Sequence, residues 1–463
     1  MHELDDLATR AVRACLDYAL ERLRYDPPPL DRPATPAELE AAVGSTITAT
    51  GRAPEEVLRQ FTDVLAPACL STDSPRHLAF IPAAPTKASL VFDAVVGVSS
   101  MCATSWLEAS GAVYAENQAL DVLVGLTGLP EGAGGCFVSG GSAGNLSALF
   151  AAREHAARER PRPRRWRVAV SAESHSSVRS TLRILDCDEL VVPTRDDRLT
   201  GDGLRAALAD DPEPEAVFAV VATAGTTNAG IIDDLAGIAE VARERGLWFH
   251  VDAAYGGAAL FAPSVRARFA GIEAADSVII DPHKWLFAPF DSCALLYRDP
   301  AVARAAHEQR ASYLEWMRVE PADPDAASDA VDHAESVWNP ADYAYHLSRR
   351  ARGLPFWFSL AVHGTDAYRD AIEQVLATTR TAADRVEAAD HVSLVRRPDL
   401  SVLLFRRPGW DDADYSAWSH RLLDEQIAFV LPSRWRGEAV GRAVFLNPRT
   451  TVDIFDEVLA AMV

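Results

Sequence analysis

The stretch DSVIIDPHKWLFAPFD, residues 276–291, places Lys284 between two apolar runs. Lysine is scarce in this chain, since Lys87 and Lys284 are the two lysines among 45 Lys and Arg residues. An arginine side chain stays protonated in proteins, whereas a lysine in apolar surroundings can lose its proton and condense with a carbonyl. We therefore expect Lys284 to act as a neutral amine. Lys87 is expected on a surface helix and has no assigned role.

The segment around Lys284 belongs to a longer alternation of short β-rich runs and helical segments, from about residue 130 to 300. Examples of the runs are RVAVSA, AVFAVVATAG, LWFHVDAA, DSVIID and CALLYRD. Such alternation favours an α/β fold with a mainly parallel sheet covered by helices. A chain of 463 residues also exceeds the size at which one core stops growing, so two or three units are expected.

Three domains are predicted along the chain. Residues 1–70 repeat apolar positions at helical spacing and form an N-terminal helical arm that serves dimerisation. Residues 71–345 form the large α/β domain, and residues 346–463 form a small C-terminal α+β domain. An acidic stretch rich in Pro, Ala, Asp and Ser interrupts the pattern, and we read it as a mobile lid over about 311–340, with a disordered surface insertion as the alternative.

Composition excludes several classes of partner. The formal charge of −21 opposes binding to nucleic acid or an anionic membrane, and the dense basic cluster at residues 161–167 reads as a solvated loop. The amino terminus lacks a secretory pattern, and no apolar run approaches the roughly 18 residues of a membrane span. Six scattered cysteines show neither a CxxC pair nor metal-ligand spacing. We expect a cytoplasmic protein without a metal site.

Ligands of an α/β sheet collect where strands end, and the first such place is glycine-rich. GGCFVSGGSAGN leads from a strand into a helix, and Gly140, Gly141 and Ser142 would direct N–H groups and a hydroxyl at an anion. A plain turn with a helix cap is the alternative. A nucleotide-binding P-loop is excluded because no lysine follows the last glycine.

Other polar residues follow further strands. His175 in SAESHSSV stands at a helix start, where a capping or satisfied core residue is the alternative. Thr226 and Thr227 in ATAGTTNAG are also compatible with an ordinary turn. Asp252 in WFHVDAA ends a very apolar strand, and a carboxylate there is costly to bury unless a cationic group meets it. The small residues after it, Ala254 among them, leave room for a flat ring.

Together these positions describe one ligand. It has an anion for the glycine-rich helix start, a flat ring, a cationic ring nitrogen for Asp252 and an aldehyde for Lys284. Pyridoxal 5′-phosphate has all four, and its ring acts as an electron sink next to a substrate amine. The sequence therefore predicts pyridoxal phosphate as the cofactor.

The same motifs resemble a known family. HVDAAYGGAAL and DPHKWLFAPFDSCALL, with SGGSAGN, SHSSV and GTTNAG upstream, are similar to the group II pyridoxal-phosphate-dependent amino-acid decarboxylases, which include aromatic-L-amino-acid decarboxylases. The resemblance covers about residues 70–370. It implies fold type I, as in aspartate aminotransferase, and an obligate homodimer whose active sites lie at the subunit interface.

The resemblance also implies roles for individual residues. Lys284 would form the internal Schiff base, Asp252 would pair with the ring nitrogen and His175 would stack on the ring. Residues implied at the phosphate are Gly140, Gly141, Ser142, Ser277 and His283, and those against the ring are Thr227 and Ala254. The lid tyrosine, Tyr313 here, would return a proton to the substrate, or else pack at the loop base; Phe80, Ile81 and Trp106 would line the substrate pocket.

The predicted reaction is decarboxylation of an L-amino acid to the amine and carbon dioxide. Tyr313 favours this outcome, since relatives with phenylalanine there tend to release an aldehyde. Aromatic decarboxylases often carry a second aromatic residue where Ile81 stands, so the substrate class stays open. Two alternatives use the same cofactor, namely oxidative deamination coupled to decarboxylation and β-elimination from a cysteine conjugate. A catalytically silent dimeric scaffold is the third.

Overall fold

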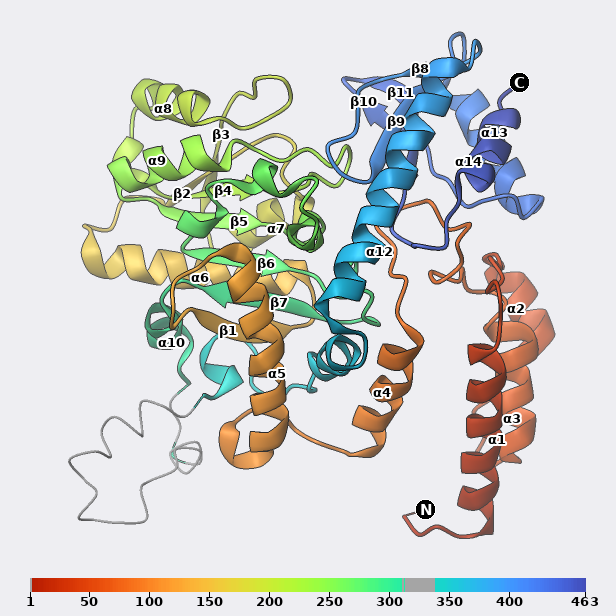
Figure 1. Cartoon of the computed structure of the whole chain (residues 1–463). Coiled ribbons are helices and arrows are strands. Elements are labelled where there is room, and N and C mark those ends of the chain that lie inside the picture. Colours follow the sequence, from red (N-terminus) through yellow and green to blue (C-terminus); the bar gives the residue numbers. More distant parts are fainter. Residues whose placement is uncertain (1, 310–311, 313–337) are drawn as a thin grey trace. The chain divides into compact units, whose positions relative to one another are not determined.

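The computed structural model describes residues 2–309, 312 and 338–463. They form two compact units (Figure 1). The large unit comprises residues 83–380 and 397–403, and the small unit comprises the residues up to 82 together with 381–396 and 404–463. The domain limits predicted from the sequence stay a prediction. The predicted lid, with Tyr313, lies outside the described residues.

A seven-stranded sheet forms the centre of the large unit. Its order is β1-β7-β6-β5-β4-β2-β3, and neighbouring strands from β3 across to β6 are parallel, whereas β7 runs antiparallel to β1 and β6. The strands are β1 Gly134–Val138, β2 Arg167–Val170, β3 Asp188–Val191, β4 Val217–Thr223, β5 Trp248–Asp252, β6 Ser277–Ile280 and β7 Cys293–Tyr297. The predicted mainly parallel α/β sheet is confirmed.

Helices cover the sheet because its central strands are apolar on both faces. Every residue of β4, β5 and β6 is buried, so these strands read as continuous apolar runs. Helix α6 packs across β1 and across β4 to β7, and α8 and α9 lie side by side (Figure 1). The helices are α4 Lys87–Val98, α5 Trp106–Thr127, α6 Gly141–Glu159, α7 Ser176–Ile184, α8 Gly201–Asp210, α9 Leu235–Arg245 and α10 Pro300–His307.

Short 3-10 helices occupy several connections of the large unit, and a long helix leaves it. The 3-10 segments are η2 Pro214–Ala216, η3 Gly256–Phe261, η4 Arg266–Phe269, η5 Ile272–Ala274 and η8 Pro340–Asp342. Helix α12, Leu354–Ala388, continues into the small unit and contains a non-helical residue, Gly364, with φ of 75°. A glycine suits this position because a positive φ strains residues with a β-carbon.

The small unit combines N-terminal helices with a second sheet. The helices are α1 Asp6–Leu23, α2 Pro36–Val43, α3 Pro54–Gln60 and the π-helix η1 Phe61–Leu65, followed later by α13 Asp412–Asp424 and α14 Val452–Ala460. The sheet order is β10-β11-β9-β8, with β8 Ser393–Leu394, β9 Val402–Arg406, β10 Ser433–Trp435 and β11 Glu438–Val444. The N-terminal helical arm and the C-terminal α+β part expected from the sequence are both present.

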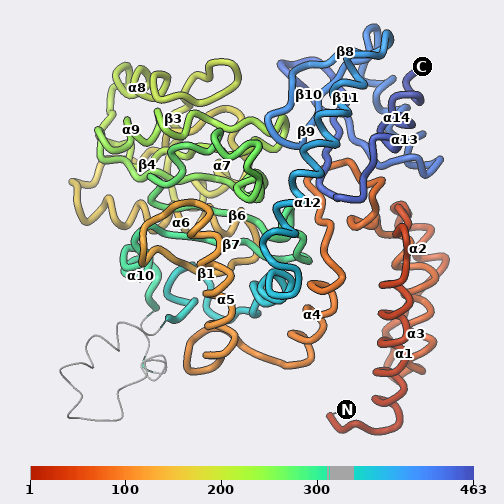
Figure 2. Tube along the Cα trace, viewed as in Figure 1, coloured from red at the N-terminus to blue at the C-terminus, as the bar shows by residue number. Residues whose placement is uncertain are grey.

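Backbone hydrogen bonds tie the segment after the N-terminal arm to the C-terminal part of the small unit, as the trace in Figure 2 allows the reader to follow. Leu78 donates its N–H to Phe429 O at 2.9 Å and accepts from Val444 N at 2.9 Å. Among the described residues, no helix is both long enough and apolar enough to cross a lipid bilayer.

Candidate active site

Lys284 lies just beyond the carboxyl end of β6, in contact with a buried acid. Its Nζ is 2.8 Å from Oδ2 of Asp281, the residue that directly follows β6. The Asp281 side chain is 1% exposed and the Lys284 side chain 23% exposed. The Lys284 side chain is therefore partly exposed, while its amine pairs with a buried carboxylate.

Asp281 affects the protonation state of Lys284. Burial alone would lower the pKa of Lys284, but the carboxylates of Asp281 and Asp252 outweigh burial and raise the pKa above its ordinary value. The expectation that apolar surroundings keep Lys284 neutral is thus wrong for the protein without its cofactor, because the residue three positions earlier pairs with the ammonium.

Asp281 is held as an anion by its neighbours. Burial would raise the pKa of Asp281, but the charges of Lys284 and His283 lower it below its ordinary value. The His283 Nδ1 lies 2.6 Å from the carbonyl oxygen and 3.0 Å from the backbone nitrogen of Ser292, and its Nε2 lies 3.6 Å from Asp281 Oδ2. The second carboxylate oxygen, Asp281 Oδ1, is buried without a hydrogen-bond partner among the described residues.

The glycine-rich start of α6 lies against this group. A β-carbon at Gly141 would stand 3.2 Å from Asp281 Oδ2 and 3.3 Å from the β-carbon of Ala254, and one at Gly140 would stand 3.7 Å from the His283 ring. Gly140 caps α6, and no side chain bonds the first turn in the described structure. Ala143 and Gly144 donate their N–H groups to the Gly140 carbonyl, which leaves the N–H groups of Gly141 and Ser142 available to an anion, and Ser142 is exposed.

Asp252 ends β5 at the same edge of the sheet. It is 6% exposed, and its Oδ2 accepts a hydrogen bond from Asn145 Nδ2 at 2.9 Å while its Oδ1 accepts from Ala254 N at 3.2 Å. Two donors on one carboxylate fix its orientation.

Behind Asp252, a buried histidine continues the polar contacts. His250 Nε2 lies 2.8 Å from Asn145 Oδ1, and His250 Nδ1 lies 2.7 Å from the hydroxyl of Ser277, which also accepts from Trp248 Nε1 at 2.9 Å. Burial lowers the pKa of His250 to about 4, although the charge of Asp252 opposes this. His250 is therefore neutral at physiological pH.

Ser277 does not join the residues around Lys284. It is the first residue of β6, so it stands at the amino end of that strand, whereas Asp281, His283 and Lys284 follow the carboxyl end. Its hydroxyl bonds His250 and Trp248. This placement argues against the predicted phosphate contact of Ser277.

His175 caps the amino end of α7 and is exposed. Its Nδ1 accepts from the backbone N–H of Ser177 at 3.2 Å and lies 2.8 Å from the hydroxyl of Ser177. Thr227, just after β4, is also exposed, while the hydroxyl of Thr226 accepts from Ile231 N at 3.1 Å. His175 thus has one ring nitrogen engaged, and its ring is open to a partner.

The predicted substrate residues fall in different parts of the chain. Trp106 is the first residue of α5 in the large unit and is half-buried. Its backbone N–H donates to Asn339 Oδ1 at 2.9 Å. Phe80 and Ile81 belong to the small unit, where Phe80 is 59% exposed and its carbonyl accepts from Arg442 at 3.0 Å. Their shared role in a pocket stays a prediction, as does the role of Tyr313.

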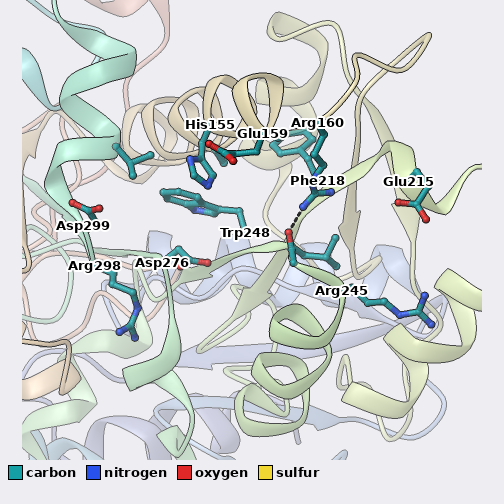
Figure 3. Close-up of a pocket in the computed structure, with 15 residues that line it drawn as sticks. His155, Glu159, Arg160, Glu215, Phe218, Arg245, Trp248, Asp276, Arg298 and Asp299 are labelled. Atoms are coloured by element: carbon teal, nitrogen blue, oxygen red, sulfur yellow. Dashed lines mark hydrogen bonds between the residues drawn. The ribbon is translucent and has the colours of Figure 1, made fainter.

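A separate cavity of about 570 Å³ opens at the amino ends of β4 and β5 (Figure 3), whereas Lys284 follows the carboxyl end of β6. Trp248 forms part of its wall, with the His155 ring 5.8 Å away at 61°. Its other charged lining residues are Glu159, Arg160, Glu215, Arg245, Asp276, Arg298 and Asp299. It contains none of the predicted site residues.

Sequence reasoning missed Asn145, His250, Ser177 and Asp281. His250 stands two residues before Asp252 in a strand, and positions two apart share a face of a sheet, so its proximity was readable. Asp281 is three residues before Lys284 in a short loop. Asn145 and Ser177 carried no sequence signal, because their contacts join α6, α7 and β5.

The described groups fit pyridoxal phosphate. The uncapped first turn of α6 suits a phosphate, Lys284 offers an amine, and the fixed carboxylate of Asp252 suits a protonated ring nitrogen. A side chain at position 141 would crowd Asp281 and Ala254, so Gly141 keeps the space between these groups open. Both the residue types and their positions are therefore compatible with pyridoxal phosphate.

Comparison with known proteins identifies similar chains. Over 385 residues, the chain is 33% identical to an L-2,4-diaminobutyrate decarboxylase of Rhizobium meliloti, covering 81% of this chain and 74% of that one. Over 426 residues, it is 28% identical to an aromatic-L-amino-acid decarboxylase of Bacillus atrophaeus, covering 88% and 84%.

A solved structure and a family model complete the comparison. The crystal structure of Oryza sativa TDC with PLP and tryptamine matches with a TM-score of 0.89 at 23% identity, over 100% of this chain and 98% of that one. The fold is therefore that of the fold type I decarboxylases, as predicted. The family model described as the pyridoxal-dependent decarboxylase conserved domain matches residues 36–407. The chain belongs to the pyridoxal-dependent decarboxylases, enzymes that remove carbon dioxide from amino acids.

Proposed function

We propose that this enzyme converts an L-amino acid into the corresponding amine and carbon dioxide, with Lys284 as the residue that bonds the cofactor aldehyde. The observation that carries the proposal is the position of the Lys284 amine, which is 2.8 Å from Asp281 and within the field of Asp252. These groups stand where the strands of a parallel sheet present their carboxyl ends, the usual ligand-binding edge.

Pyridoxal phosphate supplies an aldehyde that condenses with amines and a ring that takes up the electron pair released when the carboxylate leaves as carbon dioxide. The protein residues orient and hold charge around it. Asp252 would keep a proton at the ring nitrogen, Gly140, Gly141 and His283 would bind the phosphate, and His175 would contact the ring. Ala254 and Thr227 would also contact the ring.

Breaking the bond to the carboxylate, rather than the bond to the α-hydrogen, depends on how the substrate is oriented in the site. Tyr313 then donates a proton to the α-carbon, which completes the amine. This role of Tyr313 follows from the family resemblance.

The substrate lies in one of two classes. The relative from Rhizobium meliloti favours L-2,4-diaminobutyrate, and the relative from Bacillus atrophaeus favours aromatic amino acids. Phe80, Ile81 and Trp106 are the residues that we propose contact the substrate side chain. An aliphatic Ile81 in place of a second aromatic residue is compatible with both classes.

We further propose that the enzyme is a homodimer with shared active sites. Helix α1 exposes a row of apolar side chains at i, i+4 and i+8 spacing, namely Val12, Leu16 and Leu20, which a second copy of the chain could cover. Sedimentation analysis should give twice the chain mass of 50.1 kDa. A monomer in that measurement would refute this part of the proposal.

The decisive experiment incubates the holoenzyme with single amino acids from both classes and analyses every product by mass spectrometry. Amine and carbon dioxide in equal amounts support the proposal. An aldehyde with ammonia and peroxide would replace it by oxidative deamination, and pyruvate with a thiol would replace it by β-elimination. Absence of a cofactor absorption band after reconstitution would instead indicate a silent scaffold.

A further inference from the structure

One buried side-chain amide, that of Asn145 in the second turn of α6, contacts three different groups behind the candidate active site. Its Nδ2 donates to Asp252 Oδ2 at 2.9 Å and to Ser177 Oγ at 3.0 Å, and its Oδ1 lies 2.8 Å from His250 Nε2. Asn145 is 1% exposed. Both N–H bonds and the carbonyl oxygen of the amide are thus used inside the protein.

The directions of these hydrogen bonds follow from the carboxylate. Because ionised Asp252 can only accept, the NH₂ group of Asn145 must face it, and the amide oxygen must face His250. His250 therefore carries its proton on Nε2. Its Nδ1 then accepts from the Ser277 hydroxyl, whose oxygen accepts from Trp248. A positively charged His250 would leave the Ser277 hydroxyl without this acceptor, in agreement with the lowered pKa of His250.

The same amide reaches His175 through Ser177. The hydroxyl of Ser177 accepts from Asn145, so its own hydrogen is free to bond His175 Nδ1 at 2.8 Å. A continuous series of hydrogen bonds thus runs from Trp248, at the wall of the cavity in Figure 3, to the exposed ring of His175. Asn145 is the member that bonds in three directions.

We infer that Asn145 is a positioning residue that sets the orientation of Asp252 and His175 together, and that neutral His250 fixes the orientation of the Asn145 amide. The inference rests on the proposed roles of Asp252 at the cofactor ring nitrogen and of His175 on the ring face. Asn145 itself touches neither cofactor nor substrate in this account. Its effect reaches the cofactor through the two residues that it holds.

The chemical cost of losing the amide is large because the groups around it are buried. Hydrogen bonds to a carboxylate are stronger than neutral ones, and a buried donor or acceptor without a partner is destabilising. In Asn145→Leu, the side chain keeps a similar size while Asp252, His250 and Ser177 each lose a partner. We expect the dissociation constant of pyridoxal phosphate to rise about tenfold or more in this variant.

The first test measures that dissociation constant by quenching of tryptophan fluorescence when pyridoxal phosphate is added to the full-length apoprotein. Asn145→Leu is compared with wild type and again in the Asp252→Asn background. If Asn145 acts through Asp252, its substitution should have less than about a twofold effect in that background. An equal effect in both backgrounds would show a role independent of Asp252 and overturn the inference.

The second test uses a matched pair at His250 and remains informative if Asn145→Leu fails to fold. His250→Gln keeps an N–H donor for Asn145 and cannot be charged, whereas His250→Phe removes the donor. Cofactor affinity should stay within about threefold of wild type in the Gln variant and fall about tenfold in the Phe variant. Equal affinities in the two variants would contradict the claim that His250 acts as a neutral donor.

The third test separates the hydrogen bonds that lead from Asn145 through Ser177 to His175 from the direct hydrogen bond between Asn145 and Asp252. Ser177→Ala removes the hydroxyl link and should change the visible circular dichroism of the bound cofactor, which reports the tilt of its ring, with a smaller loss of affinity than Asn145→Leu. Ser147→Ala, a buried hydroxyl of the same helix outside this series, should change neither. An unchanged spectrum in Ser177→Ala would contradict the claim that Asn145 positions His175 through Ser177.

These measurements distinguish the inference from the proposed function. If Asp252→Asn alone leaves cofactor affinity unchanged, the proposed role of Asp252 fails. If Asp252→Asn weakens binding and Asn145→Leu does not, the proposed role stands and the inference fails.

Discussion

The ammonium of Lys284 lies 2.8 Å from the carboxylate of Asp281, a fully buried acid three residues earlier in the chain. In its proposed role as the residue that bonds the cofactor aldehyde, Lys284 has to become neutral, whereas this pair holds its amine in the charged form. Bond formation with an aldehyde requires loss of that proton, so the Asp281–Lys284 pair should govern how fast the apoprotein takes up its cofactor.

Asp281→Asn should shift the pH dependence of cofactor uptake. The raised pKa of Lys284 means that the neutral fraction, and with it the rate of covalent uptake, increases as pH rises. Without the Asp281 carboxylate, burial lowers the pKa of Lys284 with less opposition, so the rise should occur at lower pH. Stopped-flow absorbance of apoprotein mixed with pyridoxal phosphate measures the profile. Glu159→Gln, an exposed carboxyl of α6, is the control, and an unshifted profile in Asp281→Asn would contradict the prediction.

Lys284→Arg should abolish covalent capture of the cofactor while the fold persists. A guanidinium stays protonated and cannot form the bond, and the arginine can still pair with Asp281. Borohydride reduction followed by peptide mass spectrometry should find the cofactor mass on the peptide containing residue 284 in wild type and on no peptide in the variant. Lys87→Arg should label as wild type does. A reduced adduct that persists in Lys284→Arg would rule out this lysine as the anchor.

Tyr313→Phe should change the products more than the affinity for substrate. If the phenol donates the proton that completes the amine, its loss leaves the electron-rich carbon open to oxygen, and aldehyde with peroxide should appear at the expense of amine. Product ratios by mass spectrometry, together with oxygen consumption, provide the measurement. Tyr345→Phe is a suitable control, since Tyr345 lies in the large unit and has no proposed role. An unchanged ratio in Tyr313→Phe would assign the proton to another group.

Glu116→Gln should destabilise the large unit. Glu116 and Arg349 form a buried pair with two contacts of 2.7 and 2.8 Å, and Glu116 also accepts from Gly353 N. Removing one partner of a buried pair costs about 3 to 5 kcal/mol, because the remaining charge is left unpaired. The exposed pair of Arg369 and Asp366 offers the control, since Asp366→Asn should cost less than about 1 kcal/mol. Urea unfolding of both variants tests the contrast.

Buried histidines should make the holoenzyme sensitive to mild acid. Burial lowers the pKa values of His250, His307 and His346 to about 4, below the value of about 6.5 in an unfolded chain. Between these pH values the unfolded state binds more protons, so stability falls as pH drops from about 6.5 toward 4, by roughly 2 kcal/mol per histidine at pH 5. In His307→Gln, the decrease in unfolding free energy between pH 7 and pH 5 should be smaller. An equal decrease would show that His307 does not contribute.

The central strands could be predicted because their burial leaves a direct mark on the sequence. AVFAVVATAG became β4, Val217–Thr223, and WFHVD became β5, since strands covered on both faces carry uninterrupted apolar runs. The direction of β7 could not be predicted in the same way. Its run, CALLY, is as apolar as the parallel strands of the sheet, and its antiparallel course depends on the short connection from β6.

Residues of the candidate site could be predicted where the residue type itself points to a chemical role. They could not be predicted where the role depends on contacts between distant parts of the chain. Lys284 is conspicuous in a chain rich in arginine, and Asp252 is conspicuous at the end of an apolar strand. The structure brings both to one edge of the sheet together with Gly141 and Ala254. Asn145 gave no such signal, because an asparagine early in a helix is ordinary until the neighbouring strand places Asp252 beside it.

The antiparallel course of β7 has a mechanical consequence for the segment that bears Lys284. Since β7 starts where β6 ends, the chain between Ile280 and Cys293 leaves and re-enters the sheet at the same end of these strands. Both β6 and β7 have a neighbouring strand on each side. Within it, Trp285 is fully buried and stacked at 5.5 Å on Tyr255. The backbone around Lys284 is thus fixed at both ends by the sheet and between them by the buried Trp285. The amine can therefore move by rotation of the Lys284 side chain without movement of the backbone.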